Sequence, residues 1–367
     1  MEKTIFSQHI KLNKLKQKSN ISSLIEFGMN PGLISIFTKY GLKKLTKEVL
    51  DYQLKNNIVN DNLINAYNQG QYNKMAKYLE LKVIHCSEID SQIPLNKINN
   101  KINNKILLNT WSPIGLLTEG LEPMEISIGS HEITNNLLVK YNRNNYFDNL
   151  LVIDKPGYKI KMKSVVPINI NNSSINFNYI NGRVVHHGES ITLSDFLNDG
   201  DYCPTINYVY KISPLTDRFL NTHSIKKLEQ IKNGKQDIDW RVINVHDDKL
   251  DGYDNCGALF IFDKNPFTQK KESFLYWTGS ILDTNYTKNI LKDNFNSPTT
   301  IQVMAGIMSG LSYIIENNDR GLLLSEDIPE DYIINKIKPY LGTFYSGHVP
   351  NKLKLDTDIN KLIVSNK

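Results

Sequence analysis

The stretch ILLNTWSPIGLLTEGLEPMEISIGSHE, residues 106–132, is the part of the chain from which we interpret the rest. The apolar run at its start predicts a strand that enters the core, and Trp111 and a Ser-Pro break follow this run. Glu119 lies eight residues after the tryptophan, and two further glutamates come within the next six residues. An indole face beside carboxylates suits a small organic cation. The alternative is a core tryptophan next to a solvated acidic turn, because tryptophan is usually buried.

Composition indicates a globular protein with one large domain or two. The chain has 367 residues, of which 40% are hydrophobic and 10% aromatic. The net charge is +5, but the lysines are scattered and form no long basic run with interleaved aromatics, which disfavours nucleic-acid binding. No secretory segment and no apolar run of about 18 residues is present, so we expect a cytoplasmic protein without membrane contact.

The three cysteines, Cys86, Cys203 and Cys256, are odd in number and far apart. This argues against a disulfide framework and favours a reducing compartment. They also lack the close pairing of a structural zinc site, so we expect small buried side chains and no metal.

The N-terminal part predicts one α/β unit. A short buried strand at residues 22–27 ends at Gly28, a Met-Asn-Pro-Gly turn follows, and an apolar-periodic helix spans about 33–53. This order places Asn30 at the carboxyl end of the strand, where ligands sit in open parallel sheets. The alternative for Asn30 is an ordinary turn or cap residue.

The middle of the chain predicts a second helix at about 61–81 and a strand at 82–86 that leads to Ser-Glu-Ile-Asp, residues 87–90. Residues 94–105 have the composition of a surface insertion, and β-rich sequence runs from about 150 to 211. His186 and His187 follow two valines of a predicted strand. Adjacent side chains on a strand point to opposite faces, so at most one of these histidines faces a given site.

The C-terminal part predicts a helix at 215–228 and strands at 240–245, 258–262 and 274–281. A long helix at about 299–316 is rich in small residues, which favours close packing. A last strand and helix occupy about 321–339.

Several motifs, in this order, resemble bacterial-type homospermidine synthase, a family of the saccharopine dehydrogenase-like superfamily. The resemblance covers roughly residues 8–345. It rests on LIEFGMNPGLIS (24–35), VIHCSEIDSQ (83–92), NTWSPIGLLTEGLEPMEISIGSHE (109–132), VVHHGESI (184–191), LDGYDNCGALF (250–260), YWTGSIL (276–282), TTIQVMAGIMSGL (299–311) and KPYLG (338–342).

The resemblance implies an enzyme of polyamine biosynthesis that transfers an aminobutyl group from one putrescine to another on bound NAD. Putrescine is oxidised to an imine, a second putrescine displaces ammonia, and the new imine is reduced to homospermidine. A diammonium substrate needs carboxylates and an aromatic face, and one amine must lose its proton before it reacts.

By position, four residues resemble catalytic residues of the family. Trp111 corresponds to a tryptophan that stacks on the cationic substrate, a contact of order 1–2 kcal/mol when desolvated. Glu88 and Glu119 correspond to acids that bind the ammonium ends and assist proton transfer, and His187 matches the family's active-site histidine better than its neighbour does.

Three further residues are implied in binding substrate or cofactor. Asn30 matches the asparagine of the family's NPG loop, and either Asp251 or Asp254 supplies another acid. The sequence does not favour one of these two aspartates over the other.

The family's nucleotide-binding half begins with a strand, a GxGxxG-type loop and a helix ahead of the NPG turn. This sequence contains no GxGxxG motif, and the glycines of that motif let the backbone approach the pyrophosphate. We therefore expect NAD to require a Rossmann half on another polypeptide or reading frame. The alternatives are a diamine-binding relic without catalysis, or a related saccharopine-type oxidoreductase acting on another amine or amino acid.

The expected fold class is α/β, with a partial Rossmann-like parallel sheet that lacks its N-terminal part and a central mixed α+β substrate domain of saccharopine dehydrogenase type. We expect a nucleotide-binding remnant at 1–58, the substrate domain at 59–295, elements returning to the Rossmann-like layer at 296–345 and a tail at 346–367. The exposed side of the incomplete sheet should be apolar, which predicts a Rossmann-half partner or a homodimer contact.

Overall fold

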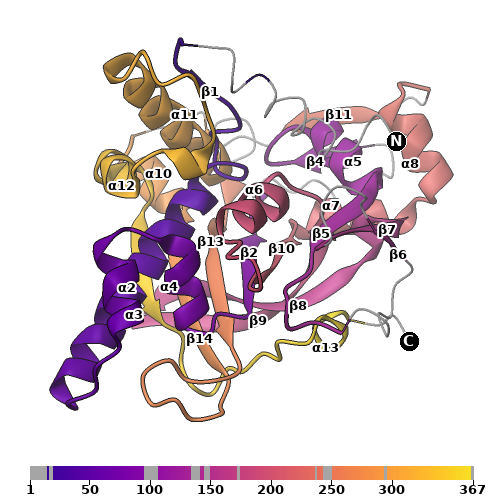
Figure 1. The fold of residues 1–367 in the computed structure, drawn as a ribbon. Coiled ribbons are helices and arrows are strands. Elements are labelled where there is room, and N and C mark those ends of the chain that lie inside the picture. Colours follow the sequence, from indigo (N-terminus) through magenta and orange to yellow (C-terminus); the bar gives the residue numbers. More distant parts are fainter. Residues whose placement is uncertain are drawn as a thin grey trace.

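A mixed β-sheet of ten strands forms the centre of the part of the chain that the structure describes (Figure 1). The computed structural model describes residues 15, 20–94, 106–133, 141–143, 149–171, 174–235, 238–242, 250–292 and 296–364. Nearly all of the predicted insertion at 94–105 lies outside these ranges. The ten strands are β2 (Val83–Asp90), β5 (Pro123–Ser127), β6 (Tyr141–Arg143), β7 (Leu150–Pro156), β8 (Lys161–Asn171), β9 (Ser174–Val185), β10 (Thr205–Lys211), β13 (Tyr253–Phe262), β14 (Phe274–Asp283) and β16 (Thr343–His348).

The strand order along the main path is β16-β14-β13-β2-β10-β5-β7-β6, and β9 joins β8 to β10. The β2–β10 pair is parallel, and the other pairs of this sheet are antiparallel. Strand β2 is buried along its whole length, as expected of a central strand covered on both faces.

One face of the central strands is covered by β8. His85 Nδ1 lies 3.1 Å from Ser164 Oγ, and Ser87 Oγ donates to the Val165 carbonyl oxygen at 2.9 Å. Because strand side chains alternate between faces, Cys86, Glu88 and Asp90 point to the opposite face. This alternation places His85 and Ser87 under β8 and puts the acidic side chains of Glu88 and Asp90 on the other face.

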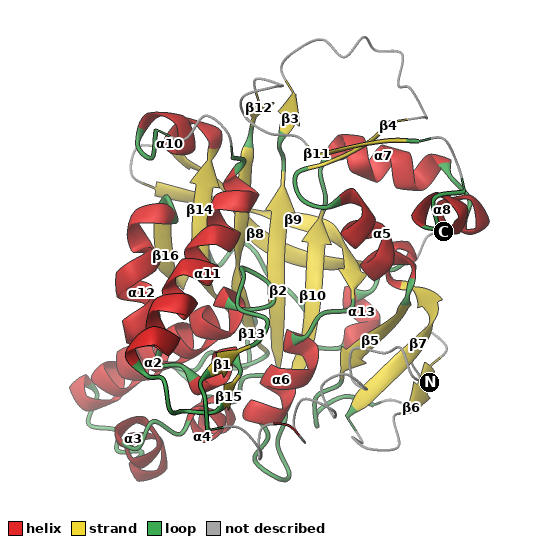
Figure 2. Cartoon of the chain, turned by 90° about the horizontal axis from the view of Figure 1, so that it is seen from above, coloured by secondary structure: helices red, strands yellow, loops and turns green. Residues whose placement is uncertain are grey.

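Helices cover that opposite face and one end of the sheet (Figure 2). The longest, α2, contacts β13 and β14, and a Cβ at its Gly41 would lie 2.5 Å from Thr278 Oγ1, so glycine there permits the close approach. The helices are α2 (Leu33–Lys55), α3 (Asp61–Asn68), α4 (Tyr72–Tyr78), α5 (Pro113–Leu121), α6 (Glu189–Phe196), α7 (Pro214–Thr222), α8 (Ile225–Lys232), α10 (Thr284–Asn289), α11 (Pro298–Glu316), α12 (Glu330–Ile337) and α13 (Ile359–Leu362).

The N-terminal strand pairs with a late segment of the chain. β1 (Ser23–Leu24) lies parallel to β15 (Leu322–Leu323), and these two strands form a separate small sheet. The turn at 28–32 then leads into α2, and Gly32 adopts a φ of 137° that favours glycine. The α/β class is confirmed by this parallel unit together with the mixed central sheet.

Two further small sheets lie outside the central sheet. β4 (Ile106–Asn109) pairs in parallel with β11 (Asp239–Val242), and β3 (Ile93–Pro94) pairs with β12 (Leu250–Asp251). Within the described residues, no helix is long and apolar enough to cross a membrane.

Some expected elements differ from the structure. The helix predicted at 61–81 is interrupted near Gly70, whose φ is +64°, and gives α3 and α4. The helix predicted at 215–228 is two helices, because Ser224 caps a new start by accepting the Lys227 N–H. The break predicted at Ser112-Pro113 lies between β4 and α5, and it is also the start of that helix. Ser112 caps α5 and Pro113 is its first residue, a pair of residues typical of a helix start.

The residues after 342 pack against the body of the protein. β16 extends the central sheet beside β14, and buried Leu355, Ile359 and Leu362 follow it. The expected division of the chain into four segments stays a prediction.

Candidate active site

Strand register places a cluster of carboxylates on the helix-covered face of the sheet. Asp90 of β2 lies opposite Asp254 of β13, and Glu88 lies opposite Cys256. Each of these four side chains is at most 4% exposed. Opposite residues in antiparallel strands have Cβ atoms about 5 Å apart, so three acids share one small buried region.

Glu88 is held by three donors from different segments. Asn30 Nδ2 and the Tyr208 hydroxyl each donate to Glu88 Oε2 at 2.6 Å, and Cys256 Sγ lies 3.4 Å from the same oxygen. Burial raises the pKa of Glu88, and the hydrogen bonds from Tyr208 and Asn30 oppose this rise. The structure thus brings the turn that carries Asn30 directly to the acid at the centre of the sheet.

Asp90 and Asp254 are joined by a hydroxyl and amide network. Thr110 donates to Asp90 at 2.6 Å, Thr299 of α11 donates to Asp254, and Gln92 Nε2 bridges by donating to both Asp90 and Thr299. Burial raises the pKa of Asp90 to about 6. The pKa of Asp254 is raised well above its usual range, first by burial and then by the charges of Glu88 and Asp90. Carboxyls so close together favour retaining a proton or binding a cation.

An aromatic wall stands beside these acids. The rings of Tyr208 and Tyr210 on β10 are stacked with centroids 5.6 Å apart and planes 13° apart. Trp111 Nε1 donates to the Tyr210 hydroxyl at 3.3 Å, and the indole is only partly buried. Trp111 therefore forms the accessible end of a wall whose inner end contacts Glu88 through Tyr208.

His187 connects a second group of carboxylates. Its Nδ1 lies 2.8 Å from Glu189 Oε2, its Nε2 lies 3.9 Å from Glu119 Oε2, and its ring packs against Tyr208. Burial alone would lower the pKa of His187, but the charges of Glu189, Glu119 and Glu88 outweigh burial and raise it to about 9. We therefore assign a protonated imidazole at neutral pH.

Glu119 lies at the accessible side of the cluster, with its side chain 29% exposed. Burial raises its pKa to about 7; the positive charge of His187 opposes the rise, and nearby Glu189 and Glu88 add to it. A carboxyl with a pKa near 7 is suited to exchange protons at neutral pH.

The structure does not bring every candidate into this cluster. Asp251 is exposed on β12, and its carboxylate accepts the Gly252 N–H at 2.8 Å. His186 is buried near Glu122, with Nε2 3.6 Å from Oε2, and burial together with the charge of His187 lowers its pKa to about 4. Two pairs of alternatives were Asp251 or Asp254 and His186 or His187. In the structure, Asp254 and His187 lie beside the acids.

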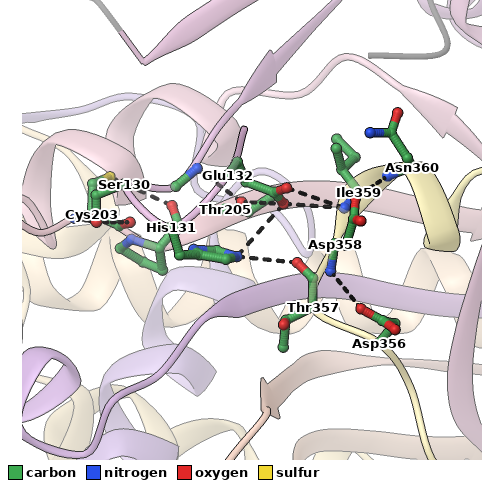
Figure 3. Close-up of polar contacts among 12 residues, drawn as sticks. Ser130, His131, Glu132, Cys203, Thr205, Asp356, Thr357, Asp358, Ile359 and Asn360 are labelled. Carbon is green, nitrogen blue, oxygen red and sulfur yellow. Dashed lines mark hydrogen bonds and ion pairs between the residues drawn. The ribbon is translucent and has the colours of Figure 1, made fainter. Parts of the chain in front are cut away.

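His131 and Glu132, at the end of the 106–132 stretch, contact the C-terminal segment. Glu132 accepts hydrogen bonds from the Ile359 N–H at 3.2 Å and from Thr205 Oγ1 at 3.1 Å, and His131 Nε2 lies 3.1 Å from the Thr357 carbonyl oxygen (Figure 3). Burial raises the pKa of Glu132 to about 7. These residues fasten the C-terminal segment to the body rather than lining the carboxylate cluster.

Sequence reasoning missed several residues of the site. Tyr208 and Tyr210 alternate in TINYVYK, and Glu88 and Asp90 alternate in CSEID, which is the period of a strand with one special face. Glu189 was not among the candidates, although it lies within the motif VVHHGESI. This alternation could have been recognised in the sequence. The pairing of β2 with β13 could not.

Most carboxyl groups of the site have raised pKa values, so a bound cation would favour their ionised forms. Among the described residues, no lysine or arginine forms an ion pair with any carboxylate of the site, and no group of His, Cys, Asp and Glu is arranged to hold a metal ion. The carboxylates concerned are Glu88, Asp90, Glu119, Glu189 and Asp254. Such a site is complementary to an organic cation that has more than one positive charge.

Fold and site together define an α/β protein with a buried acidic site beside an aromatic wall. No protein-family model matches the chain. Homospermidine synthase of Blastochloris viridis is 26% identical over 321 residues, which cover 86% of this chain and 59% of that protein. Homospermidine synthase of Mesorhizobium japonicum is 25% identical over 335 residues, covering 88% of this chain and 61% of that protein.

A solved structure that is similar to this chain is also a homospermidine synthase. Homospermidine synthase of Legionella pneumophila, in complex with NAD, matches with a TM-score of 0.75 and 26% identity, over 100% of this chain and 75% of that one. The resemblance to homospermidine synthases predicted from the motifs is confirmed. The chain spans about three fifths of the length of the two curated relatives.

Proposed function

We propose that this chain binds a diamine such as putrescine and carries the proton-transfer groups of a homospermidine synthase reaction. The observation that supports this most directly is the group of carboxyls on the helix-covered face, with His187 between Glu119 and Glu189, next to Trp111 and the stacked tyrosines. Two ammonium groups would favour and compensate ionised carboxylates in this cluster, and the aromatic wall would contact the carbon chain and the cationic end.

We assign ammonium binding and proton transfer to different residues of the site. Glu88 and Asp254, deep in the sheet, hold one ammonium end, and Trp111 stacks at the accessible end. Glu119, with a pKa of about 7, accepts the proton that an amine must lose before it reacts, and His187 keeps a positive charge that stabilises the ionised form of Glu119. Asn30 orients Glu88 through its 2.6 Å hydrogen bond.

The described residues alone do not fit the whole of NAD. The backbone N–H groups that begin α2 are occupied, since those of Leu33, Ile34 and Ser35 donate to carbonyl oxygens at Gly28, Met29 and Gly32. Free N–H groups at a helix start are what a pyrophosphate requires, and the sequence has no GxGxxG loop. NAD, when bound, supplies the hydride acceptor and donor of the reaction, and we propose that another α/β unit holds its phosphates.

The first test is binding and turnover measured separately. Putrescine titrated calorimetrically into the purified chain should bind, and a monoamine of equal carbon number should bind more weakly. Lysine should bind poorly, because its carboxylate meets an acidic site, which separates a diamine site from one for amino acids. Products of putrescine and NAD are then followed by mass spectrometry.

Turnover should require a nucleotide-binding unit supplied together with the chain. Homospermidine formed only when that unit is supplied supports the split-enzyme proposal. Putrescine binding without product under the same conditions identifies a diamine-binding relic. The absence of any putrescine binding would exclude both proposals.

A further inference from the structure

An open cleft of about 500 Å³ lies where β8, β9 and β10 meet α7. Lys161, Arg183 and Tyr210 line it from opposite positions on these three adjacent strands, so their side chains share one face of the sheet. The volume is within the range of small-molecule sites. We call this space the α7 cleft.

The other wall of the cleft is one side of α7. Four residues of this helix line the cleft at intervals of three or four positions, which places them on the same side of the helix. They are Pro214, Asp217, Arg218 and Asn221. Phe219 and Leu220, on the other side of the helix, are buried. The polar side of an amphipathic helix therefore faces the cleft.

Among the described residues that line the cleft, Asp217 alone carries a carboxyl group, and this group is already paired. Its Oδ1 accepts from Arg183 Nε at 2.9 Å, and its Oδ2 accepts from Asn221 Nδ2 at 2.8 Å. Arg183 is 3% exposed and also donates to the Tyr158 carbonyl oxygen. Arg183 and Asp217 thus compensate each other's charge.

Three further cations line the cleft from three different elements. Lys161 comes from β8, Lys211 from β10 and Arg218 from α7. Within the described ranges, none of the three forms an ion pair with a carboxylate. Cations gathered on the walls of one cleft repel each other and raise the local concentration of anions. Asn181 adds a neutral amide donor to the same lining.

We propose that the α7 cleft binds a small polyanion, a molecule with at least two phosphate or carboxylate groups. The lysines act as point charges, and the planar guanidinium of Arg218 can hold one anionic group through two parallel hydrogen bonds. The proposal goes beyond the diamine site, because none of the carboxyl groups assigned to the diamine lines this cleft.

Binding is tested by calorimetry on the full chain at low ionic strength, with tripolyphosphate and citrate as probes. We expect one molecule of at least one probe to bind per chain, with an affinity that falls as sodium chloride is added. Stronger binding of tripolyphosphate supports a phosphate ligand, and stronger binding of citrate supports a carboxylate ligand. If neither probe binds, the proposal is overturned.

Charge reversal locates the site. Lys211→Glu and Arg218→Glu should each weaken binding by roughly tenfold or more, since each removes a charge-assisted contact and adds a repulsive charge. Lys47→Glu makes the same change of net charge at an exposed position of α2, which packs on β13 and β14 (Figure 2), and should leave the affinity unchanged. Thermal unfolding checks that each variant is folded. Equal losses in all three variants would assign the attraction to overall charge and contradict the proposal.

Lysine acetylation gives a second measurement, on the unchanged chain. The chain is treated briefly with an acetylating reagent, with and without tripolyphosphate or citrate, and the peptides are quantified by mass spectrometry. Lys161 and Lys211 should react at least several-fold more slowly when the anion is bound, while Lys47 keeps its rate. Unchanged rates at both cleft lysines would place the bound anion elsewhere, and the α7 cleft would be excluded as its site.

Discussion

At the scale of single residues, Trp111 is held by one hydrogen bond while the indole face stays accessible. Its Nε1 donates to Tyr210, whose ring stacks on Tyr208, and Tyr208 in turn donates to Glu88. The indole is therefore fixed relative to the carboxylates by a chain of contacts that starts on β10. This arrangement gives Trp111 a role both in contacting a cation and in maintaining the wall.

Replacement of Trp111 by alanine should weaken putrescine binding. A lost cation–π contact of about 1–2 kcal/mol corresponds to a roughly 5- to 30-fold higher dissociation constant. Trp111→Phe keeps an aromatic face but loses the hydrogen bond to Tyr210, so it should bind with intermediate affinity. Calorimetry measures both variants, and an unchanged dissociation constant for Trp111→Ala would remove this residue from the site.

Glu119 should make diamine binding dependent on pH. Its pKa of about 7 means that roughly a tenth of it is ionised at pH 6 and nine tenths at pH 8, so affinity for a dication should rise about tenfold over that range. Binding at pH 7 should release protons, which titrations in buffers of different ionisation enthalpy detect. Glu119→Gln should flatten the pH profile. A profile of equal slope in this variant would assign the titration to another group, such as His187.

At the scale of elements, the C-terminal segment is fastened to the body through one buried glutamate. The Glu132 side chain is 3% exposed and accepts bonds from Thr205 on β10 and from the Ile359 N–H at the start of α13. The His131 ring is close, with Nε2 3.6 Å from Glu132 Oε1. A segment far along the chain thus depends on the end of the 106–132 stretch.

Removal of this carboxylate should destabilise the fold. Glu132→Ala leaves a buried N–H and a hydroxyl without their acceptor and should lower the unfolding free energy by about 1–3 kcal/mol in urea titrations. Asp356→Ala, which removes an ion pair with Lys361 near the surface, should cost less than about 1 kcal/mol. Equal effects of the two substitutions would contradict the anchoring role.

The stability of the conservative variant Glu132→Gln, relative to the natural chain, should depend on pH. Because the pKa of Glu132 in the folded state is raised to about 7, its contribution is largest below the pKa of the unfolded chain and is lost as pH rises through 7. Glu132→Gln keeps an acceptor oxygen without the charge. Its stability relative to the natural chain should therefore improve from pH 6 to pH 8, and a difference that does not change with pH would contradict the raised pKa.

Local sequence patterns predicted most elements but not their pairing. Ser-Pro at 112–113 begins α5, and Gly70 interrupts the helix predicted at 61–81, so both act through local chemistry. By contrast, the contact of Glu88 with Asn30 and Cys256 joins positions 58 and 168 residues apart. Such contacts depend on strand order and register, which a single sequence does not encode locally. The family motifs made Trp111, Glu119 and His187 candidates because motif position carries this tertiary information.

At the scale of the whole molecule, the acidic site places like charges side by side in the centre of the main sheet. Burial raises the pKa of Glu88, Asp90 and Asp254, and the charges of neighbouring carboxyls add to the rise at Asp90 and Asp254. The strands that carry them, β2 and β13, also form the middle of the core. Ligand binding and global stability are therefore expected to be linked.

Putrescine should raise the melting temperature of the chain. At a concentration of 100 times its dissociation constant, the added unfolding free energy is about 2.7 kcal/mol. A monoamine at the same concentration should give a smaller shift, and 0.5 M NaCl should reduce the putrescine shift only partly, because buried pairs are screened less than surface pairs. Differential scanning fluorimetry tests this, and equal shifts with both amines would argue against a site for two ammonium groups.

The close contact between Gly306 and Gly28 has a mechanical consequence. The turn that presents Asn30 to Glu88 packs on one side of α11, and the exposed side chains of Met308 and Ile315 are on the other side of the same helix. Only one helix diameter, about 10 Å, separates them. Because both positions are glycine, the backbones of α11 and of the turn are in direct contact. A shift of α11 is therefore expected to move the turn that carries Asn30.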